Sequence, residues 1–320
     1  MRLLSALLTL VTLTGCTFAT RPVLLKFRRE GTASPTGWVK VVTSHFTLAT
    51  DFSASTAQEA AQDIAAELAA MESAFGNTAP RFETKLNIVV YENGIDFENR
   101  FGRELAAATR VYPRENEHLV YLWGRPTRWV HHNMVGQAVS TGSQLRWTLA
   151  NVVLARQISI TVLPAWLVHG MGGYLETLAW SEDGRTIELG AVNSTLLDQY
   201  RRDRSLGFND ATGPQHDHPG QEEAYLRAFE GYSWALVYTA INTHPKGVGQ
   251  YLAALASGDS ADPTIMFEGA SPEGIDQEVE QFILRGHFSL RQVHVETNPL
   301  EAVVAPVSEA ELAHLSPPPR

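Results

Sequence analysis

The chain is poor in cysteine and in basic residues. A single cysteine in 320 residues excludes an internal disulfide and a zinc site built on several thiolates. The 25 Lys and Arg are outnumbered by 35 Asp and Glu, which gives a net charge of −10 without the basic stripe that nucleic-acid binding requires. After residue 15 no run of 18 apolar residues occurs, as a membrane-spanning helix would need. We therefore expect no nucleic-acid partner and no transmembrane helix.

What is present is enough apolar sequence for a sizeable core. Hydrophobic residues make up 44% of the chain, which argues against a disordered protein. The length is typical of one large domain or two small ones. Segments with strand-like alternation come first and helical patterns follow, so we expect an α+β protein.

The amino terminus is typical of a secretory signal. Arg2 precedes an apolar stretch, Leu3 to Leu13, that is too short to span a membrane. The following Leu13-Thr14-Gly15-Cys16 resembles the bacterial lipoprotein box. The resemblance implies cleavage before Cys16 and lipidation of Cys16, and several acyl chains give stable anchoring. We expect a cell-envelope lipoprotein, anchored to a bacterial membrane with its domain outside the cytoplasm; the alternative is a buried N-terminal helix.

Composition and periodicity divide the chain into five segments. They are a signal peptide at 1–15, a tether at 16–37, a small sheet-and-helix unit at 38–125, a mainly helical unit at 126–296 and a flexible tail at 297–320. Four basic residues of the tether could lie near anionic headgroups or simply be solvated: Arg21, Lys26, Arg28 and Arg29.

The expected elements follow from the apolar spacing and the turn signals. Strands are expected near 38–41, 46–48, 85–91 and 118–123. Helices are expected at 56–75 (with a Thr56/Glu59 capping box), 144–160, 165–179, 192–203, 222–230, 233–242, 247–256 and 275–284. Residues 207–221 are expected to form a turn-rich loop. Ser308 and Glu311 could cap a short helix in the tail.

One segment resembles a known family. Residues 163–176, LPAWLVHGMGGYLE, resemble the pattern L-P-x-W-L-x-E-G-x-A-x-Y-x-E of the peptidase MA-like family of gluzincin-type bacterial metallopeptidases. Weaker matches lie in order on both sides, and together they cover about residues 38–290: Trp38–Phe46, the Ala-rich helix, KLNIVVY at 85–91, and Tyr232–Ala235. The resemblance implies a zincin-like helical domain that follows the sheet-and-helix unit.

The family's zinc motif is degenerate in this chain. In the family, a preceding helix carries H-E-x-x-H, whose two His hold Zn²⁺ and whose Glu acts as the general base; the third ligand is the Glu of W-L-x-E-G. The helix expected at 144–160 contains neither His nor Glu. Registers starting at residue 147 or at residue 151 are possible, and apolar flanks favour the first. Trp147 and Asn151 then replace the two His, Thr148 replaces the base, and His169 stands at the third ligand.

These replacements predict the loss of the zinc chemistry. A catalytic zinc needs three good protein ligands, and His169 is the only good donor of the four positions. Thr148 does not titrate near neutral pH and cannot act as the base. We therefore expect no catalytic residue, no metal ligand and no cofactor, although zinc is expected for the family. The predicted function is a pseudopeptidase, a scaffold or binding protein for an unknown protein or peptide ligand, with Asn151 and His169 facing one cleft.

An enzyme remains the alternative. It would be a zinc-dependent metallopeptidase or another hydrolase with relocated ligands, including His169. His131 and His132 could join His169, but adjacent residues of a regular element point in different directions. The run His216-Asp217-His218 is better explained as a solvated loop. The sequence around Ser233 resembles a nucleophile elbow, which requires a preceding strand. A helical pattern precedes Ser233 instead, so we interpret this residue as the N-cap of helix 234–242.

Overall fold

Seven short strands form the main sheet of the computed structural model, which describes residues 24–31, 36–76, 85–101, 110–114, 117–124, 130–132, 138–158, 162–213, 222–258, 261–286, 288–296 and 299–316. The sheet is mixed, and its spatial order is β1-β12-β2-β3-β4-β6-β5. Its strands are β1 (Leu25–Arg29), β2 (Val39–Val42), β3 (Phe46–Thr50), β4 (Lys85–Tyr91), β5 (Arg110–Arg114), β6 (Glu117–Trp123) and β12 (Leu300–Pro306). Neighbours β3, β4 and β6 run parallel.

Helices dominate the middle of the chain. They are α1 (Ala54–Ala74), α2 (Gly94–Phe101), α3 (Thr141–Gln157), α4 (Ala165–Leu175), α5 (Ser194–Arg202), α6 (Phe208–Thr212), α7 (Glu222–Thr243), α8 (Pro245–Ala256), a 3₁₀ helix at Pro263–Phe267, α9 (Pro272–Arg285) and α10 (Glu309–His314). Two small sheets accompany them, one of β7 (Val130–His132) and β8 (Ala138–Ser140), the other of β9 (Ala179–Trp180), β10 (Thr186–Leu189) and β11 (Arg291–His294). The chain is therefore an α+β protein, as expected.

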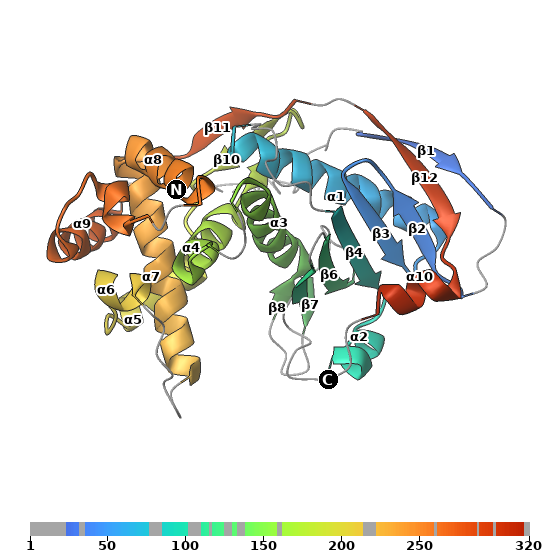
Figure 1. Cartoon of the computed structure of the whole chain (residues 1–320), viewed down its shortest axis with the longest axis horizontal. Coiled ribbons are helices and arrows are strands. Elements are labelled where there is room, and N and C mark those ends of the chain that lie inside the picture. Colours follow the sequence, from blue (N-terminus) through green and yellow to red (C-terminus); the bar gives the residue numbers. More distant parts are fainter. Residues whose placement is uncertain are drawn as a thin grey trace, which may run out of the picture.

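The main sheet is covered on both faces, which explains the almost continuous apolar run of β4. Leu86, Ile88 and Val90 share one core with residues of α1 and α3. Val89 and its neighbours on β6 point to the opposite face, where they join Phe97 of α2. Figure 1 shows the sheet at one end of the molecule, the helical part at the other, and α3 between them. Packing of α3 against both α1 and α4 connects the two parts.

Helix α1 shows how local signals position an element. Ile64, Leu68 and Met71 recur at helical spacing and are buried, as the periodicity predicts. The prediction that Thr56 caps this helix is wrong, because the helix begins about one turn earlier. Ser53 is the N-cap, and its hydroxyl accepts a hydrogen bond from the backbone N–H of Thr56 at 3.3 Å.

Both ends of the described chain belong to the main sheet, which corrects two sequence predictions. The tail expected to be flexible at 297–320 supplies β12, which lies between β1 and β2, and α10, whose Ser308/Glu311 capping box is confirmed. The tether expected at 16–37 supplies β1, so Lys26, Arg28 and Arg29 lie on a strand. Strand pairing is non-local, and the short runs at these ends carry no periodicity that reveals it. The sheet thus recruits strands from outside 38–125.

The helical part corrects two further expectations. The helices expected at 222–230 and 233–242 are one continuous helix, α7, so Ser233 lies inside it, fully buried, and is neither an N-cap nor an elbow. Gly231 does not break the helix; a Cβ there would lie 2.7 Å from the backbone nitrogen of Tyr200, so the glycine allows α5 to approach. The loop expected at 207–221 contains α6, and its residues 214–221, with His216-Asp217-His218, lie outside the described residues.

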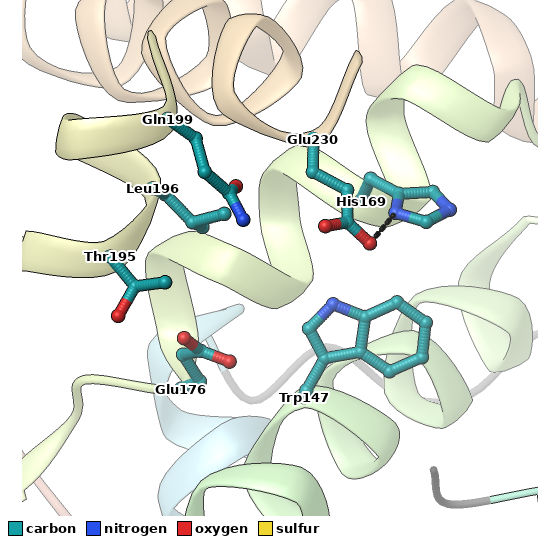
Figure 2. A pocket seen from close by; sticks show the side chains of 7 residues that line it. All are labelled: Trp147, His169, Glu176, Thr195, Leu196, Gln199 and Glu230. Atoms are coloured by element: carbon teal, nitrogen blue, oxygen red, sulfur yellow. Dashed lines mark ion pairs between the residues drawn. The ribbon is translucent and has the colours of Figure 1, made fainter. Parts of the chain in front are cut away.

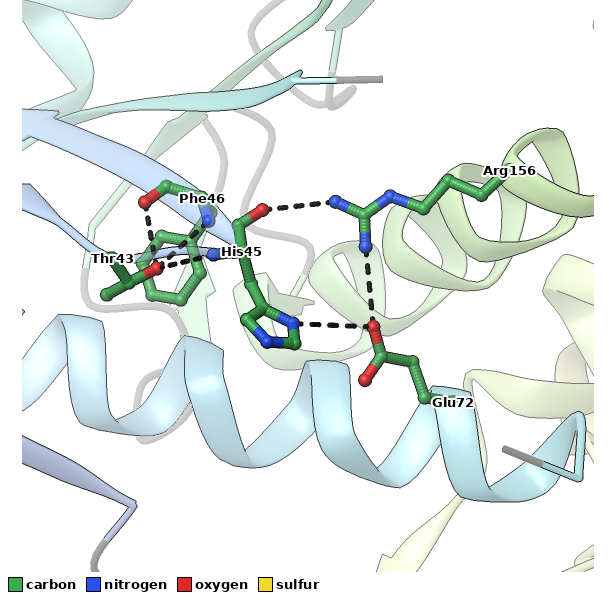
Figure 3. A network of polar contacts seen from close by, with 5 residues as sticks. All are labelled: Thr43, His45, Phe46, Glu72 and Arg156. Carbon is green, nitrogen blue, oxygen red and sulfur yellow. Dashed lines mark hydrogen bonds and ion pairs between the residues drawn. The ribbon is translucent and has the colours of Figure 1, made fainter. Parts of the chain in front are cut away.

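A polar network ties α3 to α1 and to the main sheet (Figure 3). The guanidinium of Arg156 on α3 donates to the carbonyl oxygen of His45 at 3.1 Å and pairs with Glu72 of α1 at 3.3 Å. The Nδ1 atom of His45 lies 3.7 Å from the same carboxylate oxygen. Burial, followed by the positive charge of Arg156, lowers the pKa of His118 on β6 below its ordinary value of 6.5.

The buried, neutral His118 predicts a pH-dependent stability. Its folded-state pKa is below its unfolded-state pKa, so the unfolded chain binds more protons in this range. The contribution of His118 to the free energy of unfolding is therefore fully present above pH 6.5. It is lost as the pH drops below 6.5, by at most about 1.4 kcal/mol per pH unit. We expect denaturant unfolding between pH 8 and pH 5 to show a shallower dependence for His118→Gln than for wild type. Identical slopes would contradict the assignment.

Candidate functional site

Helix α4 is held by unusually close contacts through three glycines. It begins after Pro164, whose missing N–H is harmless at a helix start. A Cβ at Gly170 would lie 2.4 Å from Val237 of α7, and one at Gly173 would lie 2.4 Å from Leu196 of α5. A Cβ at Gly172 would lie 2.2 Å from Nε1 of Trp147 on α3. At Gly173 the flexible end of Leu196 could move aside, but at Gly170 a Cβ would also lie 2.5 Å from the backbone oxygen of Ser233. Glycine at 170 and 172 therefore allows α7 and α3 to pack closely on α4.

Trp147 is held against Gly172 by its neighbour on α3. Arg146 forms a bidentate ion pair with Glu67 of α1, with Nε and Nη2 at 3.1 and 3.2 Å from the two carboxylate oxygens. Glu67 is fully buried, and such a pair is costly to break on one side only. A third contact, from Nη1 to the carbonyl oxygen of Glu176 at 3.4 Å, reaches the end of α4. Arg146 thus fixes α3 relative to both α1 and α4.

His169 of α4 lies beside Trp147 of α3. Their ring centroids are 5.7 Å apart and the rings are nearly perpendicular, at 69°. Phe229 of α7 contacts the other side of the imidazole at 5.4 Å, also edge to face. The Nδ1 atom lies 3.6 Å from a carboxylate oxygen of Glu230, and the His169 side chain remains 25% exposed. His169 is therefore a partly open residue between two aromatic rings and a carboxylate.

The other two degenerate positions are not available to a ligand. Thr148 is fully buried, and its hydroxyl has no hydrogen-bond partner. The amide nitrogen of Asn151 donates to the carbonyl oxygen of Trp147 at 2.9 Å, one turn earlier in the same helix. Its amide oxygen is buried without a partner. The structure thus brings Trp147 and His169 together, whereas Thr148 and Asn151 do not line the pocket that those two residues share.

The four positions do not fit a zinc ion. An indole has no lone pair to offer, the neutral Asn151 amide is a poor Zn²⁺ ligand whose oxygen is buried, and the Thr148 hydroxyl is buried. His169 alone cannot supply the three ligands that a catalytic zinc requires. Within the described part of the chain, no group of three or more His, Cys, Asp or Glu is arranged to hold a metal ion. The side chains of His131 and His132 lie outside that part.

A pocket of about 300 Å³ opens where α3, α4, α5 and α7 meet (Figure 2). Its lining combines two carboxylates, an imidazole, an amide, an indole and two smaller side chains. The seven residues are Trp147, His169, Glu176, Thr195, Leu196, Gln199 and Glu230. Figure 2 shows Glu230 beside His169 and Trp147 below both, with Glu176 and the α5 residues on the opposite side. The candidate site is thus a polar pocket with one aromatic wall.

Glu176 carries the most perturbed charge of this pocket. Its pKa is raised to about 7, mainly by burial and also by the nearby charge of Glu230. A hydrogen bond from the amide nitrogen of Asn193 and the positive charge of Arg146 act in the opposite direction. Asn193 is itself fixed, because its oxygen caps α5 by accepting from the N–H of Leu196 at 3.1 Å. At neutral pH this carboxyl group is therefore present in both its protonated and its ionised form.

Sequence reasoning identified two of the seven lining residues and missed the others. Glu176 ends the quoted segment 163–176 and lies seven residues after His169, which is two helical turns and the same face. That spacing was a usable signal. Glu230 and Gln199 had no such signal, since each is an ordinary polar residue on a helix that reaches the pocket only through tertiary packing.

No protein-family model matches the chain, and no curated protein matches it. The relation to the peptidase MA-like family therefore depends on the residues quoted in the sequence analysis and remains a proposal.

The contact between Gly172 and Trp147 predicts that Gly172→Ala destabilises the wild-type chain but stabilises the Trp147→Ala variant. In wild type, Gly172→Ala forces the indole to move and should lower the free energy of unfolding by about 1–3 kcal/mol. In Trp147→Ala the space is free, and Gly172→Ala should raise that free energy by about 1 kcal/mol, because alanine is the better helix former. A double-mutant cycle measured by denaturant unfolding tests this. Additive effects would contradict the packing.

Proposed function

We propose that the chain is a bacterial cell-envelope lipoprotein whose zincin-like helix pair has become a non-catalytic binding site. In this proposal the fold resembles the peptidase MA-like family, while the pocket between α3, α4, α5 and α7 binds a ligand without cleaving it. The alternative is a hydrolase that uses His169 with relocated partners.

The contact of Trp147 with Gly172 carries the proposal. Trp147 stands where the resemblance has the first histidine, and Gly172 stands where the family pattern has alanine. The indole nitrogen lies 2.2 Å from the position of a Cβ on that residue, so the two departures from the family pattern fit together sterically. A bulky, non-coordinating ring packed on the helix that carries His169 supports a site rebuilt for packing and binding rather than for metal.

The pocket also lacks a complete set of hydrolytic groups. A general base must reach the attacking water, but the Thr148 hydroxyl is buried and does not titrate near neutral pH. The pair formed by His169 and Glu230, at 3.6 Å, favours the hydrolase alternative, because a carboxylate can orient an imidazole base. Base catalysis alone contributes only about 10²- to 10⁴-fold, far less than peptide hydrolysis requires. Binding is therefore the better supported function.

The location is proposed from the amino-terminal sequence. The box that ends at Cys16 supports lipidation and export, and residues 1–23 lie outside the described part of the chain. None of the helices in the described ranges has the length and apolar character needed to cross a bilayer. Lys26, Arg28 and Arg29 on β1 follow Cys16 within 13 residues and could face anionic headgroups.

The proposal predicts neither zinc binding nor peptidase activity. The full chain, purified in detergent, should retain far less than one zinc per chain, because His169 is a single donor. It should not cleave an unfolded protein substrate in the presence of added Zn²⁺, Mn²⁺ or Co²⁺. Metal analysis and a protease assay make these measurements. Chelator-sensitive cleavage that also disappears in His169→Ala would establish the hydrolase instead.

A gain-of-ligand variant is the matched control for the metal measurement. Combining Trp147→His, Asn151→His and His169→Glu restores the three ligand types of the family at the proposed register, without restoring the base. Zinc uptake by this variant, with no cleavage, would support the zincin-like helix pair. A folded variant that takes up no zinc would contradict the register.

Anchoring through Cys16 is tested by fractionation. Cys16→Ser should move the protein from the membrane fraction to the soluble fraction, or leave its signal uncleaved, and should abolish incorporation of labelled fatty acid. Thr17→Ala, next to the lipidation position, is the control and should remain in the membrane fraction. Recovery of the wild-type chain from the cytosol with Met1 intact would refute the anchor.

A further inference from the structure

The pocket presents hydrogen-bond acceptors and negative charge, with little to balance them. Glu176 comes from the end of α4 and Glu230 from α7. None of the seven lining residues is Lys or Arg. Arg146 is the cation whose charge acts on Glu176, but its guanidinium is engaged by Glu67 and by the Glu176 carbonyl oxygen. The pocket therefore favours a positively charged ligand.

The remaining lining selects among cations. Trp147 contributes an indole, and a cation within about 6 Å of such a ring is attracted by its π electrons. An ammonium group donates in three directions and can reach carboxylates that come from two different elements, whereas a guanidinium prefers two acceptors in one plane. A volume of about 300 Å³ is enough for one aliphatic side chain but not for a folded segment. A divalent cation would need a cluster of ligands that the described residues do not form.

We propose that this pocket binds an aliphatic ammonium group, with Glu176 and Glu230 as acceptors and Trp147 as the aromatic wall. The inference rests on the proposed binding function and specifies its ligand class. The ammonium could belong to a lysine side chain of a peptide or to a free amine, and both sources share this chemistry.

The ionisation of Glu176 adds a pH dependence to the binding. Its pKa near 7 means that protonation removes one acceptor charge as the pH falls. The charged and hydrogen-bonding groups facing it are Glu230 from α7, Arg146 from α3 and Asn193 before α5, and His169 lines the same pocket. A bound cation stabilises the carboxylate, so affinity should rise between pH 6 and pH 8, while the aliphatic ammonium itself stays charged.

Calorimetric titration of the full chain in detergent tests the proposal. The probes are N-acetyl-lysine methylamide and pentylamine, and the neutral control is N-acetyl-norleucine methylamide. Both ammonium probes should bind at pH 8, and the norleucine derivative should bind at least about tenfold more weakly. Tighter binding of the lysine derivative identifies a peptide source, and tighter binding of pentylamine identifies a free amine. Equal affinity for the neutral control would overturn the proposal.

Two pocket variants and one matched control locate the binding. Glu176→Gln and Glu230→Gln should each weaken the ammonium probes about tenfold or more. Glu223→Gln makes the same charge change on α7, seven residues before Glu230 but 87% exposed, and should change affinity less than about twofold. Pocket variants that behave like Glu223→Gln would overturn the assignment.

This result is separable from the binding function itself. A chain that shows no zinc uptake, no cleavage and no ammonium binding would overturn the ligand class alone. Zinc-dependent cleavage would overturn the non-catalytic function, and ammonium binding measured in the presence of chelator would still decide the ligand class.

Discussion

The close packing around α4 is the constraint on which the rest of the site depends. Three neighbouring helices approach this one helix at positions where any Cβ would overlap them. Glycine in a helix interior costs about 1 kcal/mol relative to alanine, so three of them within four residues weaken α4 as an isolated helix. Tertiary contact must replace that loss, and it does so by surrounding α4 with Trp147, Leu196 and Val237. The walls of the pocket are therefore consequences of how α4 packs.

The same constraint couples the pocket to the sheet. Trp147 can rest on Gly172 only while α3 keeps its place, and α3 is held at one end by the Arg146–Glu67 pair and at the other by Arg156. Both arginines reach α1, which covers one face of the main sheet. Rigid elements on either side of the pocket favour preorganised binding, which reduces the entropy lost when a ligand is bound.

Apolar spacing and capping residues predicted the helices, whereas the pairing of strands that are distant in the sequence could not be predicted. The helices near 56–75, 144–160 and 165–179 follow from apolar spacing and capping, and they appear within a few residues of their expected ends. Strand β12 could not be foreseen, because its place between β1 and β2 depends on partners more than 250 residues away. Gly231 illustrates the same limit: a break was the reasonable prediction, but contact with α5 keeps α7 continuous. At the candidate site, Trp147 and His169 were identified, whereas Gln199 and Glu230 depend on the packing of α5 and α7.

The positive charge of Arg146 does not cancel the negative charge of the carboxylates that line the pocket. Arg146 places a positive charge near Glu176, yet its guanidinium is engaged by the buried Glu67 in a bidentate pair. Burial is the main reason why the pKa of Glu176 rises toward neutrality, and the Glu230 carboxylate adds to this rise. The hydrogen bond from Asn193 and the charge of Arg146 offset only part of it. The structural ion pair that fixes α3 thus also leaves the pocket carboxylates available to a ligand.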